Sequence, residues 1–225
     1  MGGGEVMKIQ PFVHDLAAAG VAIFLMSAGA IAEDNPASTS SAASNTQVTS
    51  TQFKNYPDHT FNVREYIQGM QRGGHNLLIW RDPSVNLSQY SAVKVTDFGG
   101  RLLPQQNVFS YDPFIAVFNS TFRSSLKPSQ ADAPNALLIE GAVVECNPGS
   151  RAARAWVGFG AGKAAGGVVC EVYEPGKDQP CIRIYARDTA SSGSYGGNSI
   201  AMLNNIFSVL AMRLATTLNT TLATK

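Results

Sequence analysis

The sequence predicts an α+β fold, an α/β two-layer sandwich in which a small mixed sheet carries two long helices on one face. Two helical stripes of apolar residues and several β-branched runs indicate this class. After an irregular start the expected order is β-α-β-β-β-α. A single crossover helix implies one parallel strand pair, and the hairpins that follow it imply antiparallel pairs.

Strands are expected where apolar runs lie between turn signals. Residues 92–98 alternate, with Val93 and Val95 on one face, and form the first strand of that order. Residues 136–146, 167–174 and 181–187 are apolar and β-branched, and Pro175-Gly176 is the expected turn between the last two. Residues 77–80 are a shorter apolar run, strand-like or simply packed.

Two long helices and one short helix are expected. Asp112 is a good N-cap with Pro113 at the first helical position, and Lys127-Pro128 ends that helix. The helix after Asp112 and a second helix over residues 200–222 each carry an apolar stripe, which is expected to face the sheet. The other face of the second helix is too polar for a membrane span. The stripe residues are Phe114, Phe118 and Phe122, then Leu203, Ile206, Phe207, Leu210, Leu214 and Leu218. Residues 61–70 suggest a short helix before Gly73-Gly74.

The N-terminus is expected to be a signal peptide spanning residues 1–32. Residues 16–28 form an apolar run of signal-peptide length, and Ala30-Ile31-Ala32 is a small-x-small cleavage site. Cleavage before Glu33 would give a periplasmic or secreted protein, and the absence of a cysteine near the site argues against a lipoprotein. An uncleaved anchor is the alternative, because the n-region is weakly basic.

The start of translation has two readings. Residues 2–6 are Gly-Gly-Gly-Glu-Val, whose codons all begin with G, as a translated ribosome-binding site would. Synthesis from Met7 then gives the better n-region Met7-Lys8, whereas synthesis from Met1 leaves a short extension.

The remaining chain divides into a tether and a domain. Residues 33–57 are rich in Ser, Thr, Ala and Asn, with too little apolar surface to offset chain entropy, so a disordered tether is expected. Residues 58–225 have the patterning and length of a single globular domain.

Composition excludes several function classes. The 225 residues include 17 Lys and Arg against 16 Asp and Glu, a net charge of +1. This balance lacks the basic excess of a nucleic-acid-binding protein, so no nucleic-acid partner is expected. Three cysteines and three histidines give little material for metal sites or catalytic triads, and we expect no metal and no cofactor.

The glycines suggest a functional segment. Many of the 21 glycines lie in residues 149–167 and 193–197. We call residues 149–167 the arm. Gly162-Lys163 fails as a phosphate loop, because Val157 stands where the first glycine belongs and Ala164 where Ser or Thr belongs. A dinucleotide turn fails on the spacing of its third glycine.

Three readings of the arm remain open: a flexible or self-packed connection, a loop that contacts a membrane or another copy, and a small-ligand loop. Gly158, Gly162 and Gly166 recur every four residues, which in a helix makes one smooth face. Basic side chains beside aromatic ones suit an interfacial contact. The candidate interaction residues are Arg151, Arg154, Trp156, Gly158, Phe159, Gly160, Gly162, Lys163 and Gly166.

The cysteines allow a cross-strand disulfide. With Pro175-Gly176 as the turn centre, Cys170 and Cys181 would be directly opposed, and an oxidising compartment would permit the bond. Cys146 on a neighbouring strand could pair with Cys181 instead.

Catalysis has little support in the sequence. No Gly-x-Ser-x-Gly elbow accompanies His59 or His75, which are expected on the surface. The carboxylates weighed as general acid and base, Asp97, Asp112, Asp188 and Glu140, sit where capping or solvation explains them. No enzymatic activity is therefore expected.

The segment GSRAARAWVGFGAGKA, residues 149–164, resembles the signature of a bacterial envelope family known as domain of unknown function 4410. The resemblance extends over residues 77–222. It implies export or lipid anchoring and gives no catalytic residues to transfer. The chain departs from the family in its three cysteines and in lacking a lipobox.

The sequence is compatible with two functions. The first is an exported, non-enzymatic periplasmic or cell-envelope accessory protein whose arm contacts an envelope protein, another copy or the membrane surface. The second is a periplasmic small-ligand-binding or hydrolytic domain, which requires a hollow with several convergent polar side chains.

Overall fold

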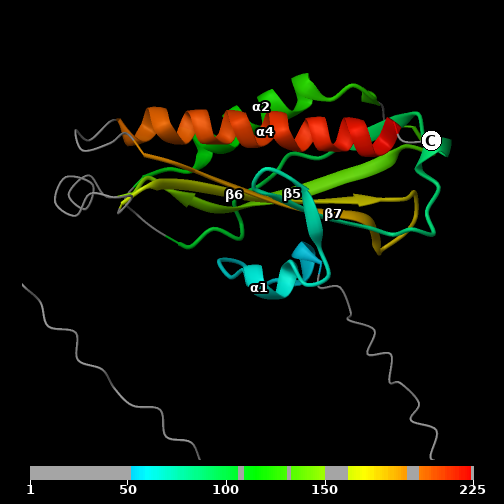
Figure 1. Cartoon of the computed structure of the whole chain (residues 1–225), viewed down its shortest axis with the longest axis horizontal. Helices are drawn as coiled ribbons and strands as arrows, with labels where there is room; N and C mark the ends of the chain where they lie inside the picture. The colour runs from blue at the N-terminus through cyan, green and yellow to red at the C-terminus, as the bar shows by residue number, and fades with distance from the viewer. Residues whose placement is uncertain (1–51, 106–108, 131–132, 150–161, 192–197, 224–225) are drawn as a thin grey trace, which may run out of the picture. The chain divides into compact units, whose positions relative to one another are not determined.

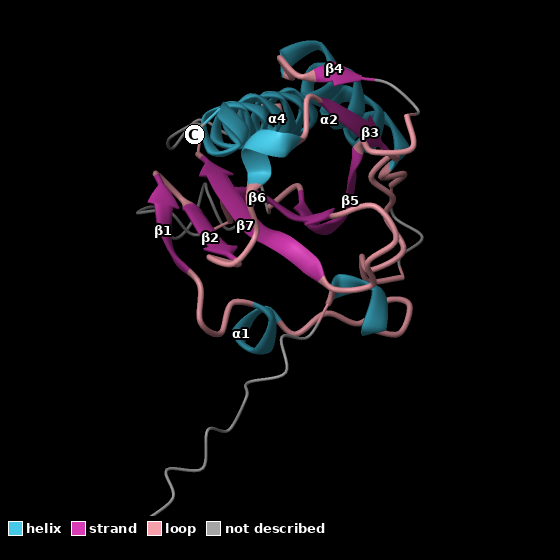
Figure 2. Cartoon of the chain, turned by 90° about the vertical axis from the view of Figure 1, so that its right-hand side faces the viewer, coloured by secondary structure: helices cyan, strands magenta, loops and turns pink. Residues whose placement is uncertain are grey.

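The computed structural model describes residues 52–105, 109–130, 133–149, 162–191 and 198–223. The expected signal peptide, its cleavage site and most of the expected tether lie outside these residues. The described residues form a mixed α+β fold, as predicted, with the two long helices packed against one face of a sheet (Figures 1 and 2).

The sheet has seven strands in the order β1-β2-β7-β6-β5-β3-β4. Their bounds are Gln71–Gly74, Leu77–Arg81, Ala92–Val95, Ser129–Gln130, Leu137–Asn147, Ala164–Tyr173 and Pro180–Ala190 for β1 to β7. β3 runs parallel to β5 and to the short β4, and the other pairs are antiparallel. The crossover helix therefore gives parallel pairing at β3, as expected from the element order.

The long helices cover the first face of the sheet. α2 is Asp112–Ser125 and α4 is Ser199–Ala223. Phe118 and Phe122 are fully buried, and Phe98, which follows β3, packs on both with ring centroids 4.9 and 5.2 Å away. All six residues of the expected α4 stripe are buried in the same core. The hydrophobic stripes thus place both helices as predicted.

α4 is also long and apolar enough to span a bilayer by length and composition, judged among the described residues only. Its stripe faces the core of the domain, so burial against the sheet accounts for its apolar character.

The start of α2 differs from the prediction by one residue. Tyr111 is the N-cap, and Asp112 is already helical. The Asp112 backbone N–H is bonded to Ser110 Oγ at 3.2 Å. The Asp112 carboxylate still lies at the positive end of the helix dipole, where an acidic residue is favourable. This explains why Asp112 predicts the start of the helix to within one residue.

The second face of the sheet is covered by a segment that we call the strap, residues 52–70. It contains a 3-10 turn, η1 (Phe53–Asn55), and the one-turn helix α1 (Val63–Tyr66), far shorter than the helix expected over residues 61–70. The strap lies on the opposite side of the sheet from α2 and α4 (Figures 1 and 2). Phe53, Tyr56 and Tyr66 are buried there with Val169 and Tyr185 of the sheet.

The strap corrects the expected domain boundary. The sequence predicts residues 52–57 to be part of the disordered tether, but Gln52 and Phe53 keep only 7% and 6% of their surface exposed. The Gln52 side-chain amide donates to the backbone carbonyl of Asp178 at 2.8 Å. The folded domain therefore starts no later than residue 52.

Candidate functional site

The described part of the arm is its base, where two glycine backbones meet. Gly149 and Gly162 have φ angles of +70° and +68°, which glycine adopts without strain. A Cβ on Gly149 would overlap the carbonyl oxygen of Gly162 and lie 2.7 Å from the carbonyl carbon of Lys163. Gly149 and Gly162, the two described residues that flank positions 150–161, are therefore side by side and form a closed stem.

The stem continues directly into the central hairpin of the sheet. β5 and β6 pair Asn147 with Ala165 and Cys146 with Gly166, and the Asn147 side chain accepts a hydrogen bond from the Gly149 N–H at 2.8 Å. Lys163 is exposed. The other candidate residues of the arm, Arg151, Arg154, Trp156, Gly158, Phe159 and Gly160, lie outside the described residues.

Gly166 has a packing role that the sequence interpretation missed. It lies inside β6, so the alternative in which Gly158, Gly162 and Gly166 line one helical face does not hold for Gly166. A Cβ on Gly166 would stand 2.7 Å from Ile206 Cγ2 and 3.2 Å from Phe207 Cζ of α4. Gly166 therefore permits the close approach of α4 to the sheet.

Substitution of Gly166 by Ala should lower the free energy of unfolding by about 1–3 kcal/mol, because the added methyl group pushes α4 away from β6. Chemical denaturation measures the change. The matched control is Gly99→Ala, since a Cβ on Gly99 meets nothing within 4 Å and the φ angle of Gly99 is not in the left-handed region. A Gly166→Ala variant as stable as wild type would contradict the packing role.

The second glycine-rich segment leaves the sheet at the same end. The last residue of β7, Ala190, pairs with Ala164, the first residue of β6. After residues 192–197, which are outside the described residues, Asn198 accepts a hydrogen bond from the Ile200 N–H at 3.0 Å and opens α4. Both glycine-rich segments are therefore attached to one end of the domain.

The cysteines do not have the expected register. Cys170 lies opposite Ile184, and β7 begins with Pro180 opposite Tyr173, so residues 174–179 connect the strands. The Cys181 thiol donates to the carbonyl of Val172 at 3.3 Å. All three cysteines are buried and free, and the prediction that Cys170 and Cys181 are directly opposed is wrong.

A buried ion pair beneath the strap is the most polar feature of the core. Glu171 of β6 and Arg183 of β7 are cross-strand partners with 0% and 2% exposure, and Arg183 Nε lies 3.9 Å from Glu171 Oε1. Glu171 accepts hydrogen bonds from the Phe53 N–H at 3.0 Å and from the Tyr173 hydroxyl. Arg183 donates to the Tyr66 carbonyl, and its guanidinium lies 4.5 Å from the Tyr66 ring centroid.

Burial dominates the titration of this cluster. Desolvation raises the pKa of Glu171 above its ordinary value, although the hydrogen bonds from Tyr173 and Phe53 and the charge of Arg183 oppose the shift. Burial likewise raises the pKa of Tyr66 well above 10. The cluster is enclosed by the strap, so its geometry supports a structural role.

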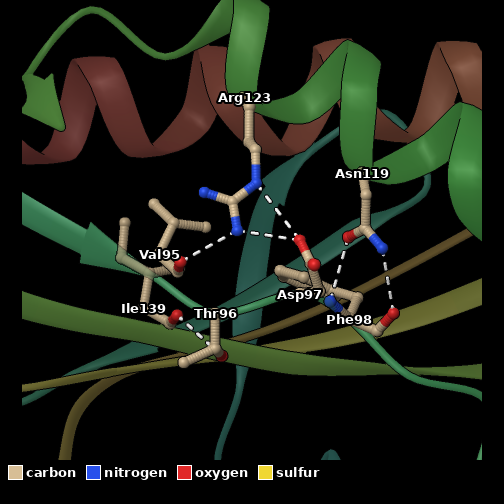
Figure 3. A network of polar contacts seen from close by, with 7 residues as sticks. All are labelled: Val95, Thr96, Asp97, Phe98, Asn119, Arg123 and Ile139. Atoms are coloured by element: carbon tan, nitrogen blue, oxygen red, sulfur yellow. Dashed lines mark hydrogen bonds and ion pairs between the residues drawn. The ribbon is translucent and has the colours of Figure 1, made fainter.

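The carboxylates considered for catalysis are held by separate partners. Asp188 is bound by Arg213 at 3.1 Å, and Glu140 by Lys54 of the strap. Asp97 accepts from Arg123 Nη2 at 2.8 Å in a network that joins the end of β3 to α2 (Figure 3). Within the described ranges, no group of three His, Cys, Asp or Glu residues could hold a metal ion.

The same network contains an asparagine with a clear structural task. Asn119 Oδ1 accepts from the Phe98 N–H at 2.9 Å, and its Nδ2 donates to the Phe98 carbonyl at 3.1 Å (Figure 3). Both backbone groups of Phe98 are thereby satisfied where the chain leaves β3, which fixes the Phe98 ring in the core.

Asn119→Ala should destabilise the domain by about 1–3 kcal/mol, because two partly buried backbone groups lose their partners. The matched control is Asn205→Ala on the exposed side of α4, which changes helix propensity equally and should cost nothing. Equal denaturation midpoints for the two variants would show that the Asn119 contacts carry no stability.

The two histidines in the described part of the chain are at the surface of the strap and of the first hairpin. His59 Nδ1 lies 2.8 Å from the Leu103 carbonyl, and His75 is exposed in the turn between β1 and β2. His75 and Arg72 line a hollow at that turn which the sequence did not indicate, because one of its walls comes from the distant β7.

Comparison with known structures gives distant matches. The PelC dodecamer from Paraburkholderia phytofirmans matches with 14% identity and a TM-score of 0.39, over 64% of this chain and 97% of that chain. A variant PelC dodecamer from the same organism matches with 18% identity and a TM-score of 0.37, over 66% and 98% of the two chains. None of the curated proteins matches.

Comparison with family models matches the central part of the chain. The matched residues, 119–196, run from α2 through β7 and include the whole arm. They match the family described as Domain of unknown function (DUF4410), which confirms the resemblance carried by residues 149–164.

Proposed function

We propose that this chain is an exported, non-enzymatic periplasmic or cell-envelope accessory protein. Its arm would contact a partner protein, another copy of the chain or a membrane surface. The observation that carries the proposal is the closed stem at Gly149 and Gly162, the residues that flank positions 150–161, which is fixed at one end of the sheet. A segment anchored in this way is suited to contact, because its base is already ordered.

The composition of residues 150–161 supports the same role. They contain Arg151, Arg154, Trp156 and Phe159 and no acidic residue. Aromatic side chains and arginines are the residues enriched in protein interfaces, and together they also suit the boundary of an anionic membrane.

Point variants separate the kinds of contact. Trp156→Ser/Phe159→Ser should reduce flotation with anionic liposomes if the aromatics enter a membrane, and should reduce the sedimentation coefficient if they join two copies. Arg151→Gln/Arg154→Gln should reduce flotation mainly at low salt, where charge attraction is least screened. A photoreactive residue at position 156, in cells that export the protein, reports a separate protein partner.

The matched control is Arg64→Gln/Lys127→Gln, which removes two exposed charges from outside the arm. If the arm variants and this control behave alike in flotation, sedimentation and cross-linking, the arm has no contact role. Gly162→Leu is unsuitable as a test, because it would strain the stem itself.

Export is tested separately. N-terminal sequencing of the protein recovered from the bacterial periplasm should begin at Glu33, and an uncleavable variant should begin at Met7. Recovery of the full chain in the cytoplasm would contradict export, and an uncleavable variant that begins at Met1 would contradict the internal start.

A further inference from the structure

A hollow of about 530 Å³ lies beside the turn between β1 and β2, and none of its walls belongs to the arm. β1, β2 and β7 are adjacent in the sheet (Figure 2), and the hollow is lined by residues from all three. It is a separate feature from the proposed contact of the arm and from the buried ion pair.

The floor and two walls of the hollow lie on the second face of the sheet. Arg72 is opposite Leu78, and Leu78 is opposite Tyr185, so these three side chains share that face. Arg187 follows Tyr185 by two residues and points to the same side. Two strand spacings, about 10 Å, separate β1 from β7, so the two arginines flank an apolar floor.

The charges around this floor favour an anion. Arg187 is oriented by Glu145, whose oxygens accept from Nε at 2.7 Å and from Nη2 at 2.9 Å, which leaves Nη1 outside that pair. Within the described part of the chain, Arg72 has no hydrogen-bond or ion-pair partner. The one carboxylate in the lining, Asp188, is engaged by Arg213 at 3.1 Å and by the Asn76 amide at 3.4 Å.

We propose that this hollow binds an oxyanion, a carboxylate or a phosphate, carried by a small molecule. Arg72 and Arg187 would hold the oxyanion through charge-assisted hydrogen bonds, which the planar guanidinium is shaped to make. The less polar part of the ligand would rest on Leu78 and Tyr185. The charge of Arg72 is not paired with any other described residue. We therefore expect the affinity for the oxyanion to depend most on Arg72.

The test is a titration of the ¹⁵N-labelled full mature chain with inorganic phosphate and with glucuronate, each against sodium chloride at equal ionic strength. Saturable shifts are expected at the amides of residues 72–76 and 185–189. Arg72→Gln should weaken binding about tenfold, the effect of one charge-assisted hydrogen bond. The affinity of Arg72→Lys should lie between those of wild type and Arg72→Gln, because lysine keeps the charge but lacks the paired N–H groups of the guanidinium.

The control is Arg64→Gln on α1, which should bind as wild type does. Saturation by phosphate alone assigns the site to phosphate-bearing ligands, and saturation by glucuronate alone assigns it to carboxylates. Shifts that only follow ionic strength, or equal affinity of wild type and Arg72→Gln, overturn the proposal. Because these variants leave the arm intact, the result is independent of the arm's contact role.

Discussion

Glu171→Gln should lower the free energy of unfolding by about 3–5 kcal/mol, because it leaves the buried guanidinium of Arg183 without a counter-charge. Gln keeps the volume and an oxygen for the Phe53 N–H, so the effect isolates the charge. Urea denaturation at neutral pH measures it. The matched control is Glu145→Gln, which breaks the partly exposed pair with Arg187 and should cost less than about 1 kcal/mol.

The two partners of this ion pair should respond unequally. Arg183→Met leaves a carboxyl that can take up a proton, whereas Glu171→Gln leaves a guanidinium that cannot lose one. We therefore expect the arginine variant to be the less damaged of the two. The double variant Glu171→Gln/Arg183→Met should recover part of the loss. A double variant whose loss equals the sum of both single losses would contradict the pairing.

Removal of residues 1–57 should destabilise the domain by at least about 3–5 kcal/mol, because the loss of one large buried aromatic side chain costs that much and two are removed. This truncation removes Phe53 and Tyr56 and exposes Glu171 beneath them. Removal of residues 1–51 alone should leave the denaturation midpoint unchanged. Equal denaturation midpoints for the two truncated chains would show that residues 52–57 are not part of the folded domain.

The strap could be missed in the sequence because its anchors are sparse. Phe53 and Tyr56 stand three residues apart in a polar stretch, without the repetition that marks an amphipathic element. Their partners, Val169 and Tyr185, are more than a hundred residues away. By contrast, the stripes of α2 and α4 repeat over several turns, and both helices could be predicted from them.

Strand pairing was harder to predict than strand position. β1 consists of four exposed residues at the edge of the sheet, two of them glycines, and so shows no alternation of apolar and polar residues. Between β6 and β7, Pro175-Gly176 supplies the positive φ of Gly176 but is not the centre of the connection. The resulting register error hid the pairing of Glu171 with Arg183, the strongest polar signal in these two strands.

The candidate site was predictable in outline only. The concentration of glycine indicated the arm. Two of those glycines, Gly149 and Gly162, have positive φ angles that glycine adopts most easily. The hollow at Arg72 had no comparable signal, because the register of β1, β2 and β7 brings its walls together.

The measurement that tests the role of the arm most directly is excision of residues 150–161. Because Gly149 and Gly162 meet at the stem, a short Asn-Gly link can join them without disturbing β5 and β6. The excised protein should unfold at the wild-type midpoint, and it should lose wild-type sedimentation, liposome flotation or envelope cross-linking. An excised protein that keeps all three would contradict the account.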